Sequence, residues 1–232
     1  VEADGQVILM FEEVGLADFS IENLTTRYPL DGSDTGYHIT GSADVDYIEG
    51  TELADTISGE GGYDDIYGRG GDDSLSGGAD GDYIEGGAGF DTIDGGEGDD
   101  LIDGGTGNDR IKAGGGDDFI VAGSGEDTIW THWGNDRVDA GIGNDHIYIQ
   151  SWGNKVVDGG LGADHFHIQS TNGLHRLFGG VGVDRVYLNG ARSDYSITAL
   201  SVAINGYQIT KKTGNLSIFI QDVEGIVYSN DS

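Results

Sequence analysis

The chain has 232 residues, with 44 glycines and one proline, and its 42 acidic and 11 basic side chains give a net charge of −31. Each glycine inside a helix costs about 1 kcal/mol relative to alanine, so this composition excludes a mainly helical protein. The charge makes nucleic acid an unfavourable partner and opposes a compact state unless cations are bound. The absence of cysteine excludes disulfides and thiolate metal sites, and no apolar run is long enough to span a membrane.

Residues 1–40 contain no repeat and are predicted to form an N-terminal capping segment. The stretch QVILMF is typical of a strand, and the acidic stretch EEVGLADFSIENL is typical of a short helix. Repeating folds need caps at their open ends, and we expect either element to cover the first coil. Because the chain starts at Val1 rather than Met, we expect it to be part of a longer protein.

A nine-residue pattern, glycine-glycine-x-glycine-x-aspartate-x-aliphatic-x, repeats twelve times from Gly41 to Tyr148. Every repeat has aspartate in the sixth place and isoleucine, leucine or valine in the eighth. Acidic, glycine-rich chains are commonly disordered, but such regular spacing indicates a repeating fold. Neighbours on a strand face opposite sides, so the eighth-place residues are expected to point inward and to form the whole core.

These repeats resemble the RTX family, the glycine- and aspartate-rich modules of bacterial proteins exported by type I secretion, over residues 41–187. The resemblance implies an all-β fold: a right-handed parallel β-roll, a calcium-filled solenoid in which six residues turn around calcium and three form a strand. It also implies a secreted, extracellular protein. Two repeats make one coil, so each turn lies over the turn of the next repeat but one.

Calcium is expected to be part of this fold. A calcium ion between two stacked turns can take carboxylate oxygens from both sixth-place aspartates and complete its shell with carbonyls, as this hard cation prefers. The alternative is that the aspartates only form turns or a solvated acidic face. The predicted ligands for multiple calcium ions are Asp46, Asp55, Asp64, Asp73, Asp82, Asp91, Asp100, Asp109, Asp118, Asp127, Asp136, Asp145, Asp164 and Asp184.

The pattern becomes irregular after Tyr148. With Ile149 treated as an insertion, Lys155 stands where the aspartate belongs, and further on His175 does so as well. We therefore expect calcium to continue along the edge that carries Asp145, Asp164 and Asp184, and the opposite edge to lack it. The first two repeats lack the fourth-place glycine and are expected to be atypical opening coils.

Residues 188–232 are predicted to form a C-terminal β cap with a secretion-type tail. The stretches RSDYSITAL, NGYQITK and LSIFI alternate polar and apolar residues, which is typical of antiparallel strands. The closing stretch QDVEGIVYSND resembles the tail that follows the roll in serralysin-type and polysaccharide-modifying RTX proteins, where it caps the roll and lies near the export signal.

Basic and aromatic residues are predicted to gather on one face of the roll. The outward seventh and ninth places of the even-numbered repeats form one file of side chains. We expect an anionic polysaccharide to bind along this file, because arginine pairs with carboxylates and sulfates. Alternatively, these residues pack under the C-terminal strands or form cross-strand pairs. Trp133 and Trp152 are expected to stack at one edge, as packing or as a sugar platform. The predicted face consists of Arg110, Lys112, Trp130, His146, Tyr148, His165, His167, Arg185 and Tyr187.

The repeats and the predicted face are compatible with two functions. The favoured one is a non-catalytic module that folds with calcium on export and binds an extracellular anionic polysaccharide, as the resemblance to the repeat modules of alginate epimerases implies. The alternative is a polyuronate lyase or epimerase-type enzyme with its site on the roll, which needs a base, a cation and an acid. The candidates for these roles are His146, Tyr148, His165, Arg185 and Arg137. No HExxH, GxSxG or phosphate-loop motif is present.

Overall fold

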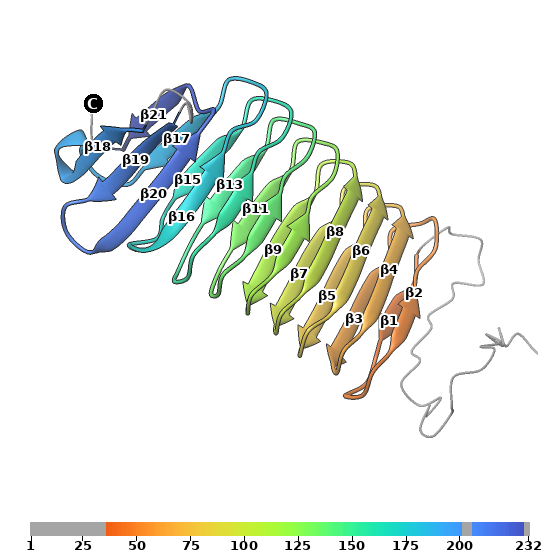
Figure 1. Ribbon diagram of the computed structural model, residues 1–232. Helices are drawn as coiled ribbons and strands as arrows, with labels where there is room; N and C mark the ends of the chain where they lie inside the picture. The colour runs from red at the N-terminus through yellow and green to blue at the C-terminus, as the bar shows by residue number, and fades with distance from the viewer. Residues whose placement is uncertain (1–35, 201–205, 230–232) are drawn as a thin grey trace, which may run out of the picture.

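The computed structural model describes residues 36–200 and 206–229, so the predicted elements in QVILMF and EEVGLADFSIENL lie outside the described residues. The chain winds into a parallel β-roll, in which successive repeats alternate between two sheets and the coils stack in chain order (Figure 1). The predicted all-β roll is therefore confirmed. No described segment forms a helix of the length and apolarity needed to cross a membrane.

The even-numbered repeats form the first sheet, which has ten strands, and the odd-numbered repeats form the second sheet, which has eleven. The first sheet contains, in spatial order, β1 (His38–Thr40), β3 (Thr56–Gly61), β5 (Ser74–Ala79), β7 (Thr92–Glu97), β9 (Arg110–Gly115), β11 (Thr128–Thr131), β13 (His146–Ile149), β15 (His165–Ile168), β17 (Arg185–Leu188) and β21 (Gly225–Tyr228). The second contains β18 (Tyr195–Ala199), β19 (Gly206–Lys211), β20 (Asn215–Gln221), β16 (Asn172–Phe178), β14 (Val156–Asp158), β12 (Arg137–Asp139), β10 (Phe119–Val121), β8 (Leu101–Thr106), β6 (Tyr83–Ala88), β4 (Asp65–Gly70) and β2 (Tyr47–Glu49).

The strand register confirms that two repeats make one coil. Thr56 pairs with Ser74, two repeats along, and the same spacing holds up to the pairing of Thr128 with His146. Past Tyr148 the insertions are absorbed in the turns, because Arg137 still pairs with Val156 and Val156 with Arg176. The predicted register around Lys155 and His175 is therefore correct.

The core is larger than the expected single row of eighth-place residues. That row is buried from Ile48 to Val186, but the residue two places later on each strand also points inward. In the early coils this residue is a glycine or alanine, such as Ala113, whereas in β13, β15 and β17 it is Ile149, Ile168 and Leu188. The insertions after Tyr148 put these larger residues at inward positions, so the later coils have two aliphatic rows.

The C-terminal cap continues both sheets of the roll. Strands β18, β19 and β20 are antiparallel, as predicted, but β20 also pairs in parallel with β16, and β21 pairs in parallel with β17. A short 3-10 helix, η2 (Arg192–Asp194), precedes β18. The Tyr195 hydroxyl donates a hydrogen bond to the Asn189 carbonyl (2.6 Å), which ties the cap to the last coil of the roll.

Candidate calcium turns and the basic and aromatic face

The sixth-place aspartates form a ladder along each edge of the roll. The backbone N–H of most of them donates to Oδ1 of the aspartate two repeats later, as from Asp73 to Asp91 and from Asp91 to Asp109 (both 2.8 Å). These side chains are buried, with at most 3 % exposed from Asp55 onward. One carboxylate oxygen of each aspartate therefore joins its coil to the preceding one.

The other carboxylate oxygen, Oδ2, is the candidate cation ligand in each turn. Among the described residues, eleven of these buried oxygens have no hydrogen-bond partner: those of Asp64, Asp73, Asp82, Asp91, Asp100, Asp109, Asp118, Asp127, Asp145, Asp164 and Asp184. Burial, with the charges of neighbouring aspartates as a smaller cause, raises the pKa of several of these carboxyls to about 7. Buried anionic oxygens without partners are costly, and this regular set fits a hard divalent cation such as calcium.

Lys155 shows which oxygen atoms a turn offers to a cation. Its side chain is fully buried, and its ammonium donates to the carbonyls of His132 and Gly134 (both 2.7 Å) and to Oδ2 of Asp136 (2.6 Å). These acceptors come from the second, fourth and sixth places of a single repeat. In this turn the ammonium supplies the positive charge that Oδ2 lacks in the other turns.

His175 continues the same edge without a carboxylate. Its Nδ1 accepts the Lys155 backbone N–H (3.2 Å), the role that an aspartate Oδ1 has elsewhere, and its Nε2 lies 2.9 Å from the Ser170 hydroxyl. Burial, with the Lys155 charge as a smaller cause, lowers the pKa of His175 to about 4, so the ring is neutral at pH 7. The edge that was predicted to lack calcium thus has a buried ammonium and a neutral imidazole in the sixth places.

In the first two repeats the aspartates find hydrogen-bond partners within their own turn. Oδ2 of Asp46 accepts from the backbone N–H of Ser42, and Oδ2 of Asp55 accepts from the backbone N–H of Thr51 (both 2.6 Å), with the side-chain hydroxyls as further donors. These two predicted ligands are therefore the weakest candidates of the set. At the other end, Glu224 accepts the Asp184 backbone N–H (2.7 Å), a role that the repeat pattern gave no means of finding.

Glycine is required where turns of successive coils approach most closely. Gly107, in the fourth place of its repeat, has φ +128°, and a Cβ there would collide with the carbonyl oxygen of Gly89 in the turn two repeats earlier. The fourth-place glycine thus allows the stacking that brings the acidic edge together.

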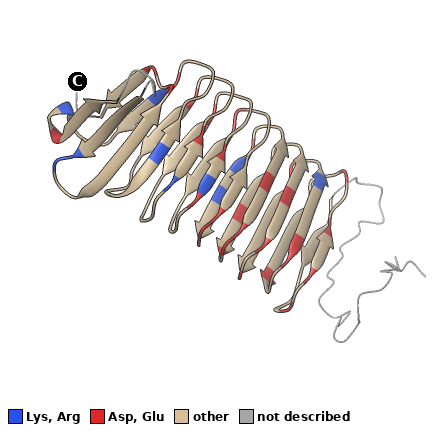
Figure 2. Cartoon of the chain, viewed as in Figure 1, with Lys and Arg blue, Asp and Glu red and all other residues tan. Residues whose placement is uncertain are grey.

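Figure 2 shows Asp and Glu along the turns and on strands of the N-terminal coils, with Lys and Arg on strands of the middle coils.

The predicted file of basic and aromatic residues lies on one face of the first sheet, and we call it the basic and aromatic face. The pairings place Arg110 beside Thr128, Trp130 beside Tyr148, and His165 beside Arg185. The C-terminal strands β18 to β20 extend the second sheet, so they do not cover this face. Arg110, Lys112 and Arg185 are exposed, and the aromatic residues and histidines are half-buried.

The rings on this face stack on one another. Trp130, Tyr148, His167 and Tyr187 follow each other with centroid separations of 5.5, 4.5 and 4.7 Å and interplanar angles of 10–13°. The expected cross-strand pairing is therefore real, and it occupies both faces of the Tyr148 ring. The Tyr148 ring therefore has no free face on which a sugar could stack, and among these four rings only Trp130 and Tyr187, at the ends of the stack, have a face free of the others.

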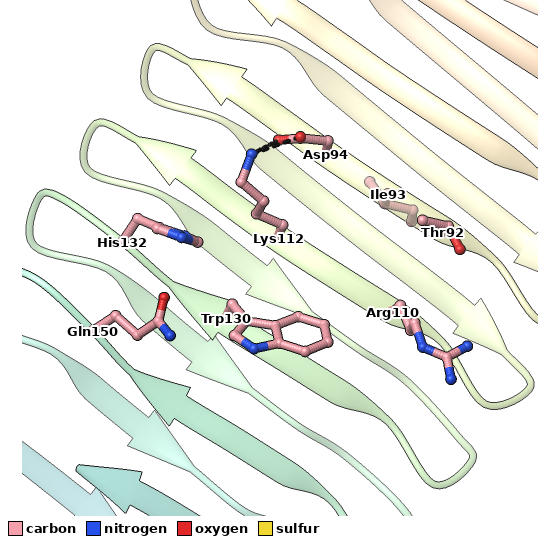
Figure 3. A pocket seen from close by; sticks show the side chains of 8 residues that line it. All are labelled: Thr92, Ile93, Asp94, Arg110, Lys112, Trp130, His132 and Gln150. Atoms are coloured by element: carbon pink, nitrogen blue, oxygen red, sulfur yellow. Dashed lines mark hydrogen bonds and ion pairs between the residues drawn. The ribbon is translucent and has the colours of Figure 1, made fainter. Parts of the chain in front are cut away.

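A shallow hollow of about 450 Å³ lies where the ring stack ends at Trp130 (Figure 3). Arg110 and Lys112 line it on one side, and His132 and Gln150, which the sequence analysis did not select, line it on the other. Asp94 also contributes, because its carboxylate pairs with the Lys112 ammonium (2.7 Å). Lys112 therefore brings less net charge to the face than its sequence position implied.

The remaining candidates fall into two groups. Trp133 and Trp152 are exposed and line a common hollow of about 330 Å³ at the roll edge, so they lie together as expected, although no ring stacking between them is present. Arg137 lies on β12 in the second sheet, with its guanidinium 5.8 Å from the Phe119 ring centroid. It therefore cannot act together with His146, Tyr148, His165 and Arg185 on the first sheet.

The comparison with known families agrees with this geometry. The RTX calcium-binding nonapeptide repeat (4 copies) matches residues 49–84, 76–111 and 112–147. Residues 49–147 are thus RTX repeats, and the chain contains a calcium-binding β-roll. No curated protein sequence matches the chain significantly.

Proposed function

We propose that this β-roll is a module of a secreted protein that folds when it meets calcium outside the cell. The buried, unpartnered Oδ2 atoms from Asp64 to Asp184 support this, because their mutual repulsion opposes folding until a cation is bound. Export in an unfolded state from a calcium-poor cytosol into a calcium-rich medium would then be coupled to folding, since metal binding becomes folding free energy when the unfolded chain has no site.

We further propose that the basic and aromatic face binds an extracellular anionic polysaccharide. The observation that carries this proposal is that cationic and aromatic side chains form one file on the first sheet, which the described strands β18 to β20 do not cover, in a chain with a net charge of −31. The hollow beside Trp130 is the best place for a sugar ring, because the Trp130 ring ends the stack there and Arg110 lies at its side. Five neighbouring strands span about 19 Å, enough for a short oligosaccharide.

The test uses two matched pairs of variants in calcium buffer, with binding to alginate and to a sulfated glycan measured by calorimetry. Arg110→Ala and Trp130→Ala are expected to weaken binding by about tenfold each, the equivalent of about 1.4 kcal/mol. Arg137→Ala, on the second sheet, and Trp152→Ala, at the edge, are the controls and should leave binding unchanged. Binding should also weaken with salt, since screening acts within about 8 Å at physiological ionic strength. Equal effects within each pair, or no binding by the parent, contradict the proposal.

The same polysaccharides also distinguish an enzyme from a non-catalytic binding module. His146, Tyr148, His165 and Arg185 lie on neighbouring strands of one face, an arrangement that could serve proton abstraction beside a carboxylate. A lyase produces an unsaturated uronate that absorbs in the ultraviolet. Cleavage of a polyuronate that His146→Ala abolishes while binding persists would establish the enzyme in place of the binding module.

A further inference from the structure

Three histidine side chains meet on the basic and aromatic face. His146 lies on β13, and His165 and His167 lie on β15, where His165 is the direct partner of His146 in the strand pairing. One ring nitrogen from each residue can be chosen so that all three lie within 4.8 Å of one another. The closest pair is Nδ1 of His146 and Nε2 of His167, at 3.3 Å.

One nitrogen–nitrogen separation of a tetrahedral metal site is already present in this cluster. Zn–N bonds of about 2.0–2.1 Å at tetrahedral angles separate two ligand nitrogens by about 3.3–3.4 Å, which is the separation already present between His146 and His167. The His165 ring stands at 84° to the His146 ring and at 77° to the His167 ring. Its nitrogen needs to move inward by about 1.5 Å, the difference between 4.8 and 3.3 Å. The His146 ring is within 13° of parallel to the His167 ring, so it also has to turn for both nitrogens to point at one ion. Side-chain rotation covers both changes.

The surroundings hold one of the three rings in place. His167 lies between the Tyr148 and Tyr187 rings, with interplanar angles of 10° and 13°. Burial, with His146 as a smaller cause, lowers the pKa of His167 to about 4, and burial also lowers the pKa of His165, so both rings are neutral at pH 7. The opposing feature is Arg185, whose charge also acts on His165, but its guanidinium is exposed and therefore screened by solvent.

We propose that His146, His165 and His167 bind one divalent transition-metal ion of the zinc class, with the fourth coordination position open to solvent. Imidazole nitrogen is a preferred ligand of zinc, copper and nickel and not of calcium, which takes oxygen. The site is also separate in space from the calcium turns, because it lies on a sheet face and the aspartates lie along the edges. The roll thus carries two kinds of metal site, distinguished by ligand chemistry.

The test is a zinc titration of the full chain in saturating calcium, so that the carboxylate turns are filled before zinc is added. The parent is expected to bind one zinc ion per chain. Each of His146→Ala, His165→Ala and His167→Ala should weaken this binding by at least about tenfold, a change of about 1.4 kcal/mol. His38→Ala removes an exposed histidine from β1 of the same sheet and is the matched control, which should bind zinc as the parent does.

Cobalt(II) provides a second measurement that does not depend on affinity. A site with three imidazoles gives cobalt the visible absorption of a tetrahedral complex, and this band should be present in the parent and in His38→Ala and absent in the triple alanine variant. Circular dichroism in calcium confirms that each variant folds, which is expected because the three side chains lie outside the core.

If the triple variant binds zinc as the parent does, the ion lies in the aspartate turns and the proposal is overturned. If the parent binds none, the 3.3 Å contact is only a hydrogen bond between two histidines and the proposal is equally overturned.

Discussion

The regular coils up to Asp127 and the later coils from Thr128 to Leu188 have the same backbone register but differ in what stabilises them. In the regular coils each turn from Asp64 onward leaves a buried carboxylate oxygen without a partner, and glycine or alanine fills the second inward row. In the later coils one turn contains the Lys155 ammonium, and Ile149, Ile168 and Leu188 fill that row. Each such side chain contributes about 1.5–3 kcal/mol when buried. A β-roll can thus replace metal binding by a tethered cation and a wider core without changing its coil geometry.

The largest expected effect is the loss of the roll when calcium is removed. In chelator the unpartnered aspartates repel one another across stacked turns, and the thin core of the regular coils does not compensate. At pH 7, circular dichroism is expected to show coil without calcium and β-structure in millimolar calcium. A magnesium buffer of equal ionic strength is the control for simple charge screening. A native-like spectrum in excess chelator would contradict the calcium requirement.

The next largest effect concerns the buried ammonium. Lys155→Met removes the partner of Asp136 Oδ2 and of two carbonyls, and breaking a buried ion pair in this way costs about 3–5 kcal/mol. Lys112→Met breaks the Lys112–Asp94 pair, whose side chains are 48 % and 43 % exposed, and should cost less than about 1 kcal/mol. Urea unfolding in saturating calcium compares the two variants. Equal losses would show that the Lys155 ammonium does not hold its turn together.

Substitution of single aspartates sharpens the comparison within the regular coils. Asp100→Asn alters a turn with an unpartnered Oδ2, whereas Asp55→Asn alters a turn whose Oδ2 already accepts from Thr51. We expect Asp100→Asn to lower the number of calcium ions bound and to raise the calcium concentration needed for folding by about tenfold, or about 1.4 kcal/mol. Asp55→Asn should leave the number of bound ions unchanged. Calcium titration against a competing indicator dye measures both quantities, and loss of an ion in Asp55→Asn would show that the first coils bind calcium too.

The sequence predicted the backbone better than the side-chain contacts. The nine-residue period determines which residues lie above one another, so the register around Lys155 and the file from Arg110 to Tyr187 followed from counting. The period does not determine where a long side chain ends. The turn of Lys155 was predicted to lack a complete calcium site, but the ammonium reaching back to Asp136 was not foreseen. The stacking that occupies both faces of Tyr148 depends on ring rotation, which spacing alone does not specify.

The smallest expected effect is a pH response of opposite sign at the carboxylate turns of the regular coils and at the turn of His175 when calcium is absent. Asp73, Asp100 and Asp109 have a pKa of about 7 in the folded chain, against 3.8 for the free side chain, so the folded state binds more protons between these values. Their contribution therefore favours folding as the pH falls from 7 toward 4. His175 has its pKa lowered from 6.5 to about 4, so here the unfolded state binds more protons and folding is disfavoured over that interval.

Hydrogen exchange in chelator at pH 7 and pH 5, corrected for the intrinsic exchange rate, should show protection gained in the coils of Asp73 to Asp109 and none gained around Lys155 and His175. In saturating calcium the sign for the regular coils reverses, because protons compete with the metal for the same carboxylates. The same change at both kinds of turn would mean that the His175 turn is held in the same way as the carboxylate turns.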